Sequence, residues 1–177
     1  QIGLYDHKEN HFEHHFNWAA EEYLKTHSFI KAIKYLAKNN NDFDIVFRPH
    51  PVENIESWKF YLDGIPNVYV IRESAINSWI NNSFAVMHCG CTSAIEATLA
   101  GKPVVSYVPF QMNYSSTYTN KLGYRVETLE KLSSTINDIF NGRDSIDQND
   151  LLKSSSEIFS RKIHLDKNEL AAQKIVK

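Results

Sequence analysis

The stretch FAVMHCGCTSAIEATLAGKPVVSY, residues 84–107, decides the fold class of this chain. An apolar run at 84–88 passes through a turn of small residues into a helical stretch at 92–100. Gly101 ends that stretch, and a second apolar run follows at 103–107. Glycine directly after a helix is a common C-terminal signal, and continuous apolar strands beside helices are typical of parallel sheets covered on both faces. The stretch therefore predicts a strand–helix–strand unit of a parallel sheet.

The same alternation of strands and helices extends in both directions from this unit. We predict further strands at residues 2–5, 44–48, 68–71 and 124–127, and helices at 18–38, 53–63, 75–81, 129–140, 151–162 and 168–177. A polar, histidine-rich connection is expected at 6–17, a loop at 111–119, and Ser74 is expected to cap the helix that follows it. With right-handed crossovers, this order predicts an α/β fold: a Rossmann-like, doubly wound parallel sheet of about six strands with C-terminal helices.

Length and composition fit one globular domain, which we expect at residues 1–145 with a helical tail at 146–177. The 177 residues include 19 Lys+Arg and 21 Asp+Glu, and 42% are hydrophobic. These values exclude a disordered chain and a supercharged nucleic-acid-binding arm, and the dispersed basic residues argue against a nucleic-acid partner. The longest apolar runs are too short to span a bilayer. Two cysteines, Cys89 and Cys91, do not make a disulfide framework, which favours a cytosolic protein.

The segment RPHPVE, residues 48–53, follows a predicted strand and is the first candidate for a functional site. Two prolines fix the backbone on either side of His50, which positions an imidazole at the strand end with little loss of entropy. Arg48 beside it supplies a planar cationic fork that suits phosphate. The alternative is a rigid surface turn with an ion-paired arginine, and the segment alone leaves both open.

The turn from the strand at 84–88 into the next helix is the second candidate. Gly90 allows a tight turn or the close approach of a ligand. The backbone N–H groups of Thr92, Ser93 and Ala94 are expected to point out of the helix start, where they would form an anion site together with two hydroxyl groups.

Glu96 lies one helical turn beyond Thr92 and on the same face, where its carboxylate could accept hydrogen bonds from a ribose diol. The alternative is a capping box that Glu96 forms with Thr92 or Ser93, and both arrangements can coexist. The chain has no G-x-x-x-x-G-K-[ST] and no G-x-G-x-x-G after a strand, which argues against P-loop phosphoryl transfer and against hydride transfer. The histidines near residue 11 and the C-x-C at Cys89 lack matching ligands, so we expect no metal and no cofactor.

Residues 88–105, HCGCTSAIEATLAGKPVV, resemble the donor-site signature of GT-B glycosyltransferases. UDP-GlcNAc 2-epimerase, which shares that fold, has a similar small-residue turn, Glu and Gly-x-Pro-Val. The Arg48-Pro49-His50-Pro51 element is similar to the Arg-His-Pro element of bacterial surface-polysaccharide transferases, including Kdo, sialic-acid and glycerol-phosphate polymer enzymes. Together the motifs resemble the C-terminal half of a surface carbohydrate biosynthesis protein, over roughly residues 44–132.

The resemblance implies roles for the matching residues. Five of them would bind the donor nucleotide or its phosphate: Arg48, Gly90, Thr92, Ser93 and Glu96. Within this set Glu96 would bind the ribose hydroxyls. His50 would be the catalytic candidate, because a histidine near the departing phosphate can donate a proton or a hydrogen bond. His88 would end its strand beside the same crevice and is the second candidate. The loop DHKEN, residues 6–10, departs from the glycine-rich turn of many such domains.

The resemblance also implies a partner domain and an activity. The acceptor site would be on a separate N-terminal domain that this chain has no room for, so the chain alone is expected to be an incomplete half. The expected activity is metal-independent transfer of a sugar from a nucleotide donor, CMP- or CDP-linked rather than UDP-linked, to a glycan or lipid-linked acceptor. It would serve bacterial capsule or lipopolysaccharide synthesis in the cytoplasm, at the inner face of the plasma membrane. The alternatives are a hydrolysing UDP-GlcNAc 2-epimerase-like enzyme, a CDP-glycerol-type polymer transferase, and a non-catalytic Rossmann-like binding module.

Overall fold

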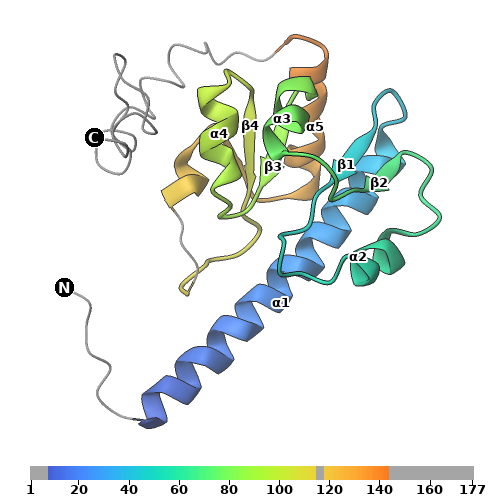
Figure 1. Cartoon of the computed structure of the whole chain (residues 1–177). Helices are drawn as coiled ribbons and strands as arrows, with labels where there is room; N and C mark the ends of the chain where they lie inside the picture. Colours follow the sequence, from blue (N-terminus) through green and yellow to red (C-terminus); the bar gives the residue numbers. More distant parts are fainter. Residues whose placement is uncertain (1–7, 115–117, 144–177) are drawn as a thin grey trace, which may run out of the picture.

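The computed structural model describes residues 8–114 and 118–143, in which helices and strands alternate along the chain (Figure 1). The helices are α1 (Lys8–Asn39), α2 (Ile55–Leu62), α3 (Ile76–Asn82), α4 (Ser93–Leu99) and α5 (Leu129–Phe140), with a 3-10 helix η1 (Tyr118–Lys121). The strands are β1 (Ile45–Phe47), β2 (Val68–Val70), β3 (Val86–His88), β4 (Val104–Tyr107) and β5 (Tyr124–Val126). The predicted strand at 2–5 and the predicted helices at 151–162 and 168–177 lie outside the described residues.

The strands are parallel to their partners, as predicted, but they form two sheets. In one sheet β1 pairs with β2, with Ile45 opposite Val68. The other has the order β3-β4-β5, with Val86 opposite Val104. A parallel α/β arrangement is thus confirmed, whereas the single sheet of about six strands is not: the described residues contain five strands, and no ladder joins β1 to β3.

The amino ends of β1 and β3 meet at one edge of the molecule. The ring of Phe43, just before β1, lies 5.2 Å from the ring of Phe84, just before β3, in an edge-on contact. Both rings also contact Phe140 at the end of α5, at 5.3 and 5.2 Å. Because the two strands start at the same place, their carboxyl ends and the loops that follow them share the opposite edge.

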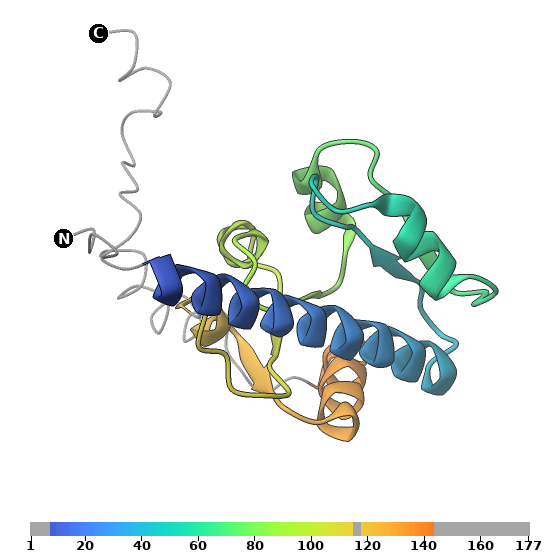
Figure 2. The same ribbon diagram turned by 90° about the horizontal axis from the view of Figure 1, so that it is seen from below.

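The helices cover the two sheets from two sides. Hydrophobic clusters place α1, α2 and α5 on one face, and α3 and α4 on the other. Figure 2 shows α1 lying across both sheets, with α5 on one side of it and α2 on the other. From β1 the chain passes to its partner β2. It then returns through α3 to β3, beside β1, and continues to β4 and β5 in the second sheet.

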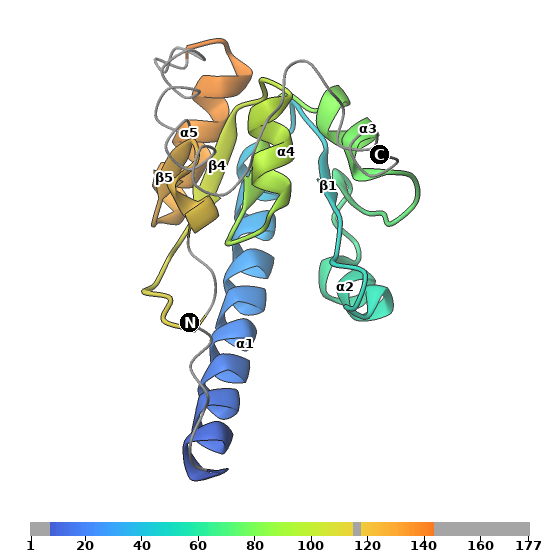
Figure 3. The ribbon, with the colours of Figure 1, turned by 60° about the vertical axis from the view of Figure 1, so that its left-hand side comes forward.

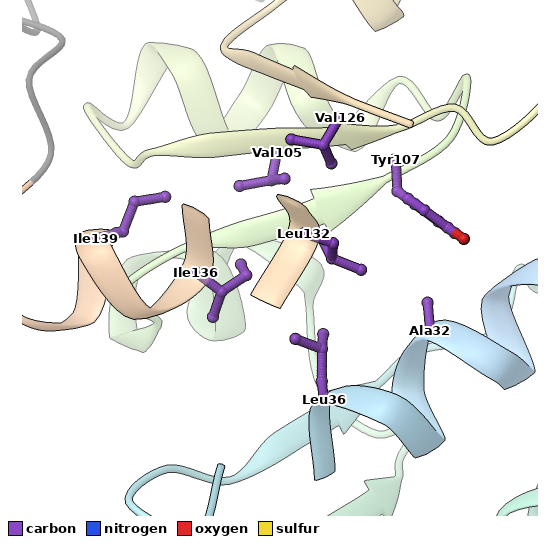
Figure 4. Close-up of a cluster of buried hydrophobic side chains, with 8 residues drawn as sticks. All are labelled: Ala32, Leu36, Val105, Tyr107, Val126, Leu132, Ile136 and Ile139. Atoms are coloured by element: carbon purple, nitrogen blue, oxygen red, sulfur yellow. The ribbon is translucent and has the colours of Figure 1, made fainter. Parts of the chain in front are cut away.

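The largest core cluster lies between α1, α5 and the second sheet (Figure 4). Its buried members are Ala32, Leu36, Val105, Tyr107, Val126, Leu132, Ile136 and Ile139. Strand β4 is the middle of its sheet, and all four of its residues are buried. This burial explains the continuous apolar run predicted at 103–107, because a central parallel strand meets apolar neighbours on both faces.

The connection predicted at 6–17 is wrong from Lys8 onward, because α1 begins there. No proline or glycine interrupts residues 8–39, and Phe12 and Phe16 stand one turn apart on one helix face. The first half of α1 extends away from the rest of the described chain (Figures 1 and 3). Phe12 and Phe16 are 76% and 65% exposed, so these two rings add little to the core, whereas the ring of His14 between them lies 5.4 Å from the ring of Tyr114.

The short helices differ in how they begin. Asn54 caps α2, with its side-chain oxygen accepting a hydrogen bond from the Glu56 N–H at 2.9 Å. Ser74 does not cap α3 as predicted: the N-cap is Ala75, and Ser74 has a φ of 67° that turns the chain before the helix. None of the helices in the described ranges is both long and apolar enough to cross a membrane.

We expect Thr128→Ala to lower the free energy of unfolding by about 1 kcal/mol. Thr128 is the N-cap of α5, and its hydroxyl oxygen accepts a hydrogen bond from the Lys131 N–H at 3.2 Å. Urea unfolding of the purified protein measures the change. Ser134→Ala is the control, because Ser134 is an exposed residue of the same helix and caps nothing. Equal stability of the two variants would contradict a capping role for Thr128.

Candidate functional site

The candidate site lies at the carboxyl ends of β1 and β3. In the described residues β1 is an edge strand of the two-stranded sheet and β3 is an edge strand of the three-stranded sheet. In open α/β sheets, ligands bind beyond the carboxyl ends of the strands. The two segments singled out in the sequence, 48–53 and 88–96, are the ones that directly follow β1 and β3.

Arg48 is held by the neighbouring loop. Its guanidinium donates hydrogen bonds to the carbonyls of Glu73, Arg72 and Ser74, at 2.7, 3.1 and 2.9 Å. The guanidinium carbon also lies 5.6 Å from the centre of the Trp79 ring. Three of its five N–H groups are therefore directed at the loop after β2, an arrangement that favours a positioning role over direct contact with a phosphate.

Arg72 makes the reciprocal contact, which the sequence analysis missed. It follows β2, and its guanidinium donates to the carbonyls of Glu53 and His50 in the loop after β1. The two arginines thus cross-brace the two loops, and we call this pair the arginine brace (Arg48 and Arg72). One signal was present in the sequence: each of the first two described strands is followed closely by an arginine, as IVFR at 45–48 and VYVIR at 68–72.

His50 is exposed at the end of the braced loop. Its backbone N–H donates to the Glu53 carboxylate, which also accepts a hydrogen bond from the Trp58 indole at 3.2 Å. The Val52 N–H lies 3.4 Å from His50 Nδ1 and donates to it. In the neutral ring the proton is therefore on Nε2, the nitrogen that is free to donate to a ligand. The Glu53 carboxylate therefore holds the loop, a role that the sequence analysis did not predict.

The turn after β3 is fixed by a distant side chain. Gly90 has a φ of 72°, a conformation that glycine adopts without strain. Its N–H donates to the side-chain oxygen of Asn120 at 2.7 Å. Asn120 is 1% exposed on η1, so this bond ties the turn to the core. Nothing in the local sequence around Gly90 indicates Asn120, because the two residues are 30 positions apart.

The start of α4 leaves two of the three predicted donors open. The N–H of Ala94 donates to the Cys91 carbonyl at 3.3 Å, so this predicted anion ligand is occupied. The N–H groups of Thr92 and Ser93 have no hydrogen-bond partner among residues 8–114 and 118–143. The Ser93 hydroxyl donates to Cys91 Sγ at 3.0 Å.

Glu96 is exposed on the first turn of α4. No side chain caps this helix: Thr92 is its N-cap residue in a helical conformation and makes no capping hydrogen bond. The capping box considered from the sequence is therefore not formed. Thr92 is exposed one turn before Glu96, so a hydroxyl and a carboxylate stand on the same side of the helix.

The sequence analysis placed His88 beside the crevice. In the structure it lies in the core instead, at 3% exposure. The Ser106 hydroxyl lies 2.8 Å from its Nε2 and donates its own proton to the Leu122 carbonyl at 3.0 Å. The bond to Ser106 is therefore donated by Nε2–H. Nδ1 is buried without a partner in the described part of the chain, and burial lowers the pKa of His88 to about 4. A neutral histidine in this position favours a structural role.

Cys89 and the loop after β4 complete the surroundings of the turn. Burial raises the pKa of Cys89 to about 11, so its thiol stays protonated near neutral pH, and Sγ lies 3.4 Å from Met112 Sδ. Glu21 of α1 anchors the loop after β4, since its carboxylate accepts hydrogen bonds from the N–H groups of Asn113 and Tyr114 at 2.6 and 3.1 Å.

Across 8–114 and 118–143, no three His, Cys, Asp or Glu side chains are grouped to hold a metal ion.

Comparison of the sequence with protein-family models and with curated proteins found no match to either.

Proposed function

We propose that this chain is the donor-binding half of a GT-B-type glycosyltransferase that uses a nucleotide-activated sugar in bacterial surface polysaccharide synthesis. The observation that supports the proposal is that the two motif segments follow β1 and β3, two strands that begin side by side. We propose in addition that its fold is one half of a GT-B enzyme, with a sheet of about six strands.

The start of α4 would bind the nucleotide. The open N–H groups of Thr92 and Ser93 would donate to a donor phosphate, with the exposed Thr92 hydroxyl beside them. The exposed Glu96 carboxylate, one turn further on, would accept hydrogen bonds from the two ribose hydroxyls. Gly90 has no side chain, so the backbone of the turn can approach the phosphate closely.

The loop after β1 would serve the leaving group. His50 Nε2, the ring nitrogen that does not accept from Val52, would donate to the phosphate oxygen as the bond to the sugar breaks. Arg48 would act as a positioning residue, because its hydrogen bonds to the 72–74 carbonyls keep the loop at the edge of the sheet. His88 would hold β3 to β4 through Ser106 and would not touch the donor.

Glu96→Gln is expected to weaken nucleotide binding at least tenfold, because an amide accepts fewer hydrogen bonds from a diol than a carboxylate, and with less strength. Calorimetric titration of the 177-residue chain with CMP, CDP, UDP and GDP measures the affinity and identifies the base. Glu130→Gln is the matched control, since Glu130 is an exposed glutamate on the first turn of α5. Binding of none of the four nucleotides, or equal loss in both variants, would contradict the proposal.

A further inference from the structure

The buried side chain of Asn120, on η1, makes its hydrogen bonds to two connections that follow strands. Its Oδ1 accepts from the N–H of Gly90 at 2.7 Å, in the turn after β3. Its Nδ2 lies 3.6 Å from Sδ of Met112 and donates to it, in the loop after β4. These two contacts settle the orientation of the amide, because only its oxygen can accept from an N–H and only its nitrogen can donate to a sulfur.

The contacts close around the turn after β3. Cys89 directly precedes Gly90, and its Sγ lies 3.4 Å from the same sulfur of Met112. The turn is therefore held at two successive residues, at Cys89 by Met112 and at Gly90 by Asn120. Met112 and Asn120 are in turn held to each other by the hydrogen bond between them.

The loop that carries Met112 has supports of its own. The carboxylate of Glu21, a buried residue of α1, accepts from the N–H groups of Asn113 and Tyr114 at 2.6 and 3.1 Å. The ring of Tyr114 also lies 5.4 Å from the ring of His14, one helix face further along α1. Met112 can therefore serve as a fixed point against which the turn is held.

The amide of Asn120 does something that packing alone does not. Burial of an amide is costly unless its groups form hydrogen bonds, and an apolar side chain of similar size would fill the same space without that cost. What the amide adds is a fixed direction for the N–H of Gly90, which has a φ of 72°. A glycine turn has access to many backbone conformations, and this bond selects one of them.

We propose that Asn120 is a positioning residue for the donor site, an inference that rests on the proposed function. By accepting from the Gly90 N–H, Asn120 keeps that group directed into the protein and holds the turn in the conformation that the donor phosphate meets. Without this bond the turn would populate other conformations, and the affinity for the nucleotide would fall with the fraction that remains competent. Asn120 is buried, so it acts through Gly90 and does not contact the donor.

Asn120→Leu tests the inference, because leucine keeps most of the buried volume and makes neither hydrogen bond. We expect calorimetric titration with CMP, CDP, UDP and GDP to show binding that is weaker by about tenfold. In amide exchange followed by NMR, the Gly90 amide should exchange faster by about tenfold, because it has lost its acceptor. The amide of Val105, in the central strand β4, should stay protected and so report an intact fold.

Thr119→Val is the matched control. Thr119 is fully buried on η1 beside Asn120, and its Oγ1 has no hydrogen-bond partner in the described part of the chain. Valine has nearly the same shape, so both the nucleotide affinity and the Gly90 exchange should match those of the unsubstituted chain. A side chain that only stabilised the fold would change the urea midpoint, but it would leave the Gly90 amide and the affinity of the folded protein unchanged.

Three results would overturn the inference. Fast exchange of the Gly90 amide in the unsubstituted chain would show that Asn120 does not hold the turn, and this measurement requires no variant to fold. Unchanged affinity in Asn120→Leu, or an equal loss in Thr119→Val, would refute the positioning role alone. If the unsubstituted chain bound none of the four nucleotides, the proposed function would fail, and the positioning role would fail with it.

Discussion

Gly123→Ala is expected to lower the free energy of unfolding by roughly 3–5 kcal/mol, a large share of the stability of an ordinary domain. Gly123 has a φ of 68°, which costs a residue with a Cβ about 1–2 kcal/mol. A Cβ at this position would also lie 2.0 Å from the carbonyl oxygen of Val104. Val104 is buried in the central strand of its sheet, so this backbone cannot move without disturbing the core.

Gly142→Ala separates the two causes. Gly142 has a φ of 65°, and nothing lies within 4 Å of an added Cβ. Gly142→Ala should lower the free energy of unfolding only by the backbone contribution, about 1–2 kcal/mol. Urea unfolding of both variants gives the comparison. A loss for Gly123→Ala no greater than for Gly142→Ala would mean that β5 does not press against β4 as described.

The second large effect is a loss of stability in acid that comes from His88. Burial lowers the pKa of His88 to about 4 in the folded protein, against 6.5 for the ordinary side chain. The unfolded chain therefore binds a proton more readily, and stability falls as the pH decreases from 6.5 toward 4. Over the whole window the loss is about 3 kcal/mol, and between pH 7 and pH 5 it is about 2 kcal/mol.

His88→Gln isolates this contribution, because glutamine cannot take up the proton and its amide can still donate to Ser106. We expect the stability of His88→Gln to change about 2 kcal/mol less than that of the unsubstituted protein between pH 7 and pH 5. His50→Gln removes an exposed histidine and is the control, expected to match the unsubstituted protein. If all three proteins lost the same stability between pH 7 and pH 5, His88 would not be the source of the acid sensitivity, and the description of it as buried and neutral would be wrong.

The elements of the fold could be predicted where a local pattern decides them. The apolar run at 103–107 became β4, because a strand buried on both faces has no polar side. Gly64 and Gly101 end their helices with positive φ, since few other residues tolerate that conformation. The start of α1 could not be predicted in this way. Residues 8–17 suit a helix and a polar connection about equally, and no local pattern indicates the contact of His14 with the ring of Tyr114 in a distant loop.

The sequence indicated which two loops form the candidate site, but it did not indicate the residues that hold those loops in place. The loops after β1 and β3 follow from the strand ends alone. Arg72 and Asn120 hold those loops from 19 to 30 residues away, and no local pattern indicates such pairs. His88 shows the opposite error. It ends a strand beside the turn, but the side of the sheet that it faces depends on Ser106 and Leu122.

Because of the arginine brace, the loop after β1 loses its conformational entropy during folding and not during ligand binding. Because the guanidinium of Arg72 holds the carbonyls of His50 and Glu53, and Arg48 holds the loop after β2, the backbone around His50 is ordered as the chain folds. Ordering a backbone residue costs about 1–2 kcal/mol of conformational entropy. A molecule that meets His50 therefore encounters a surface already in its final form, and its binding free energy is not reduced by having to arrange it.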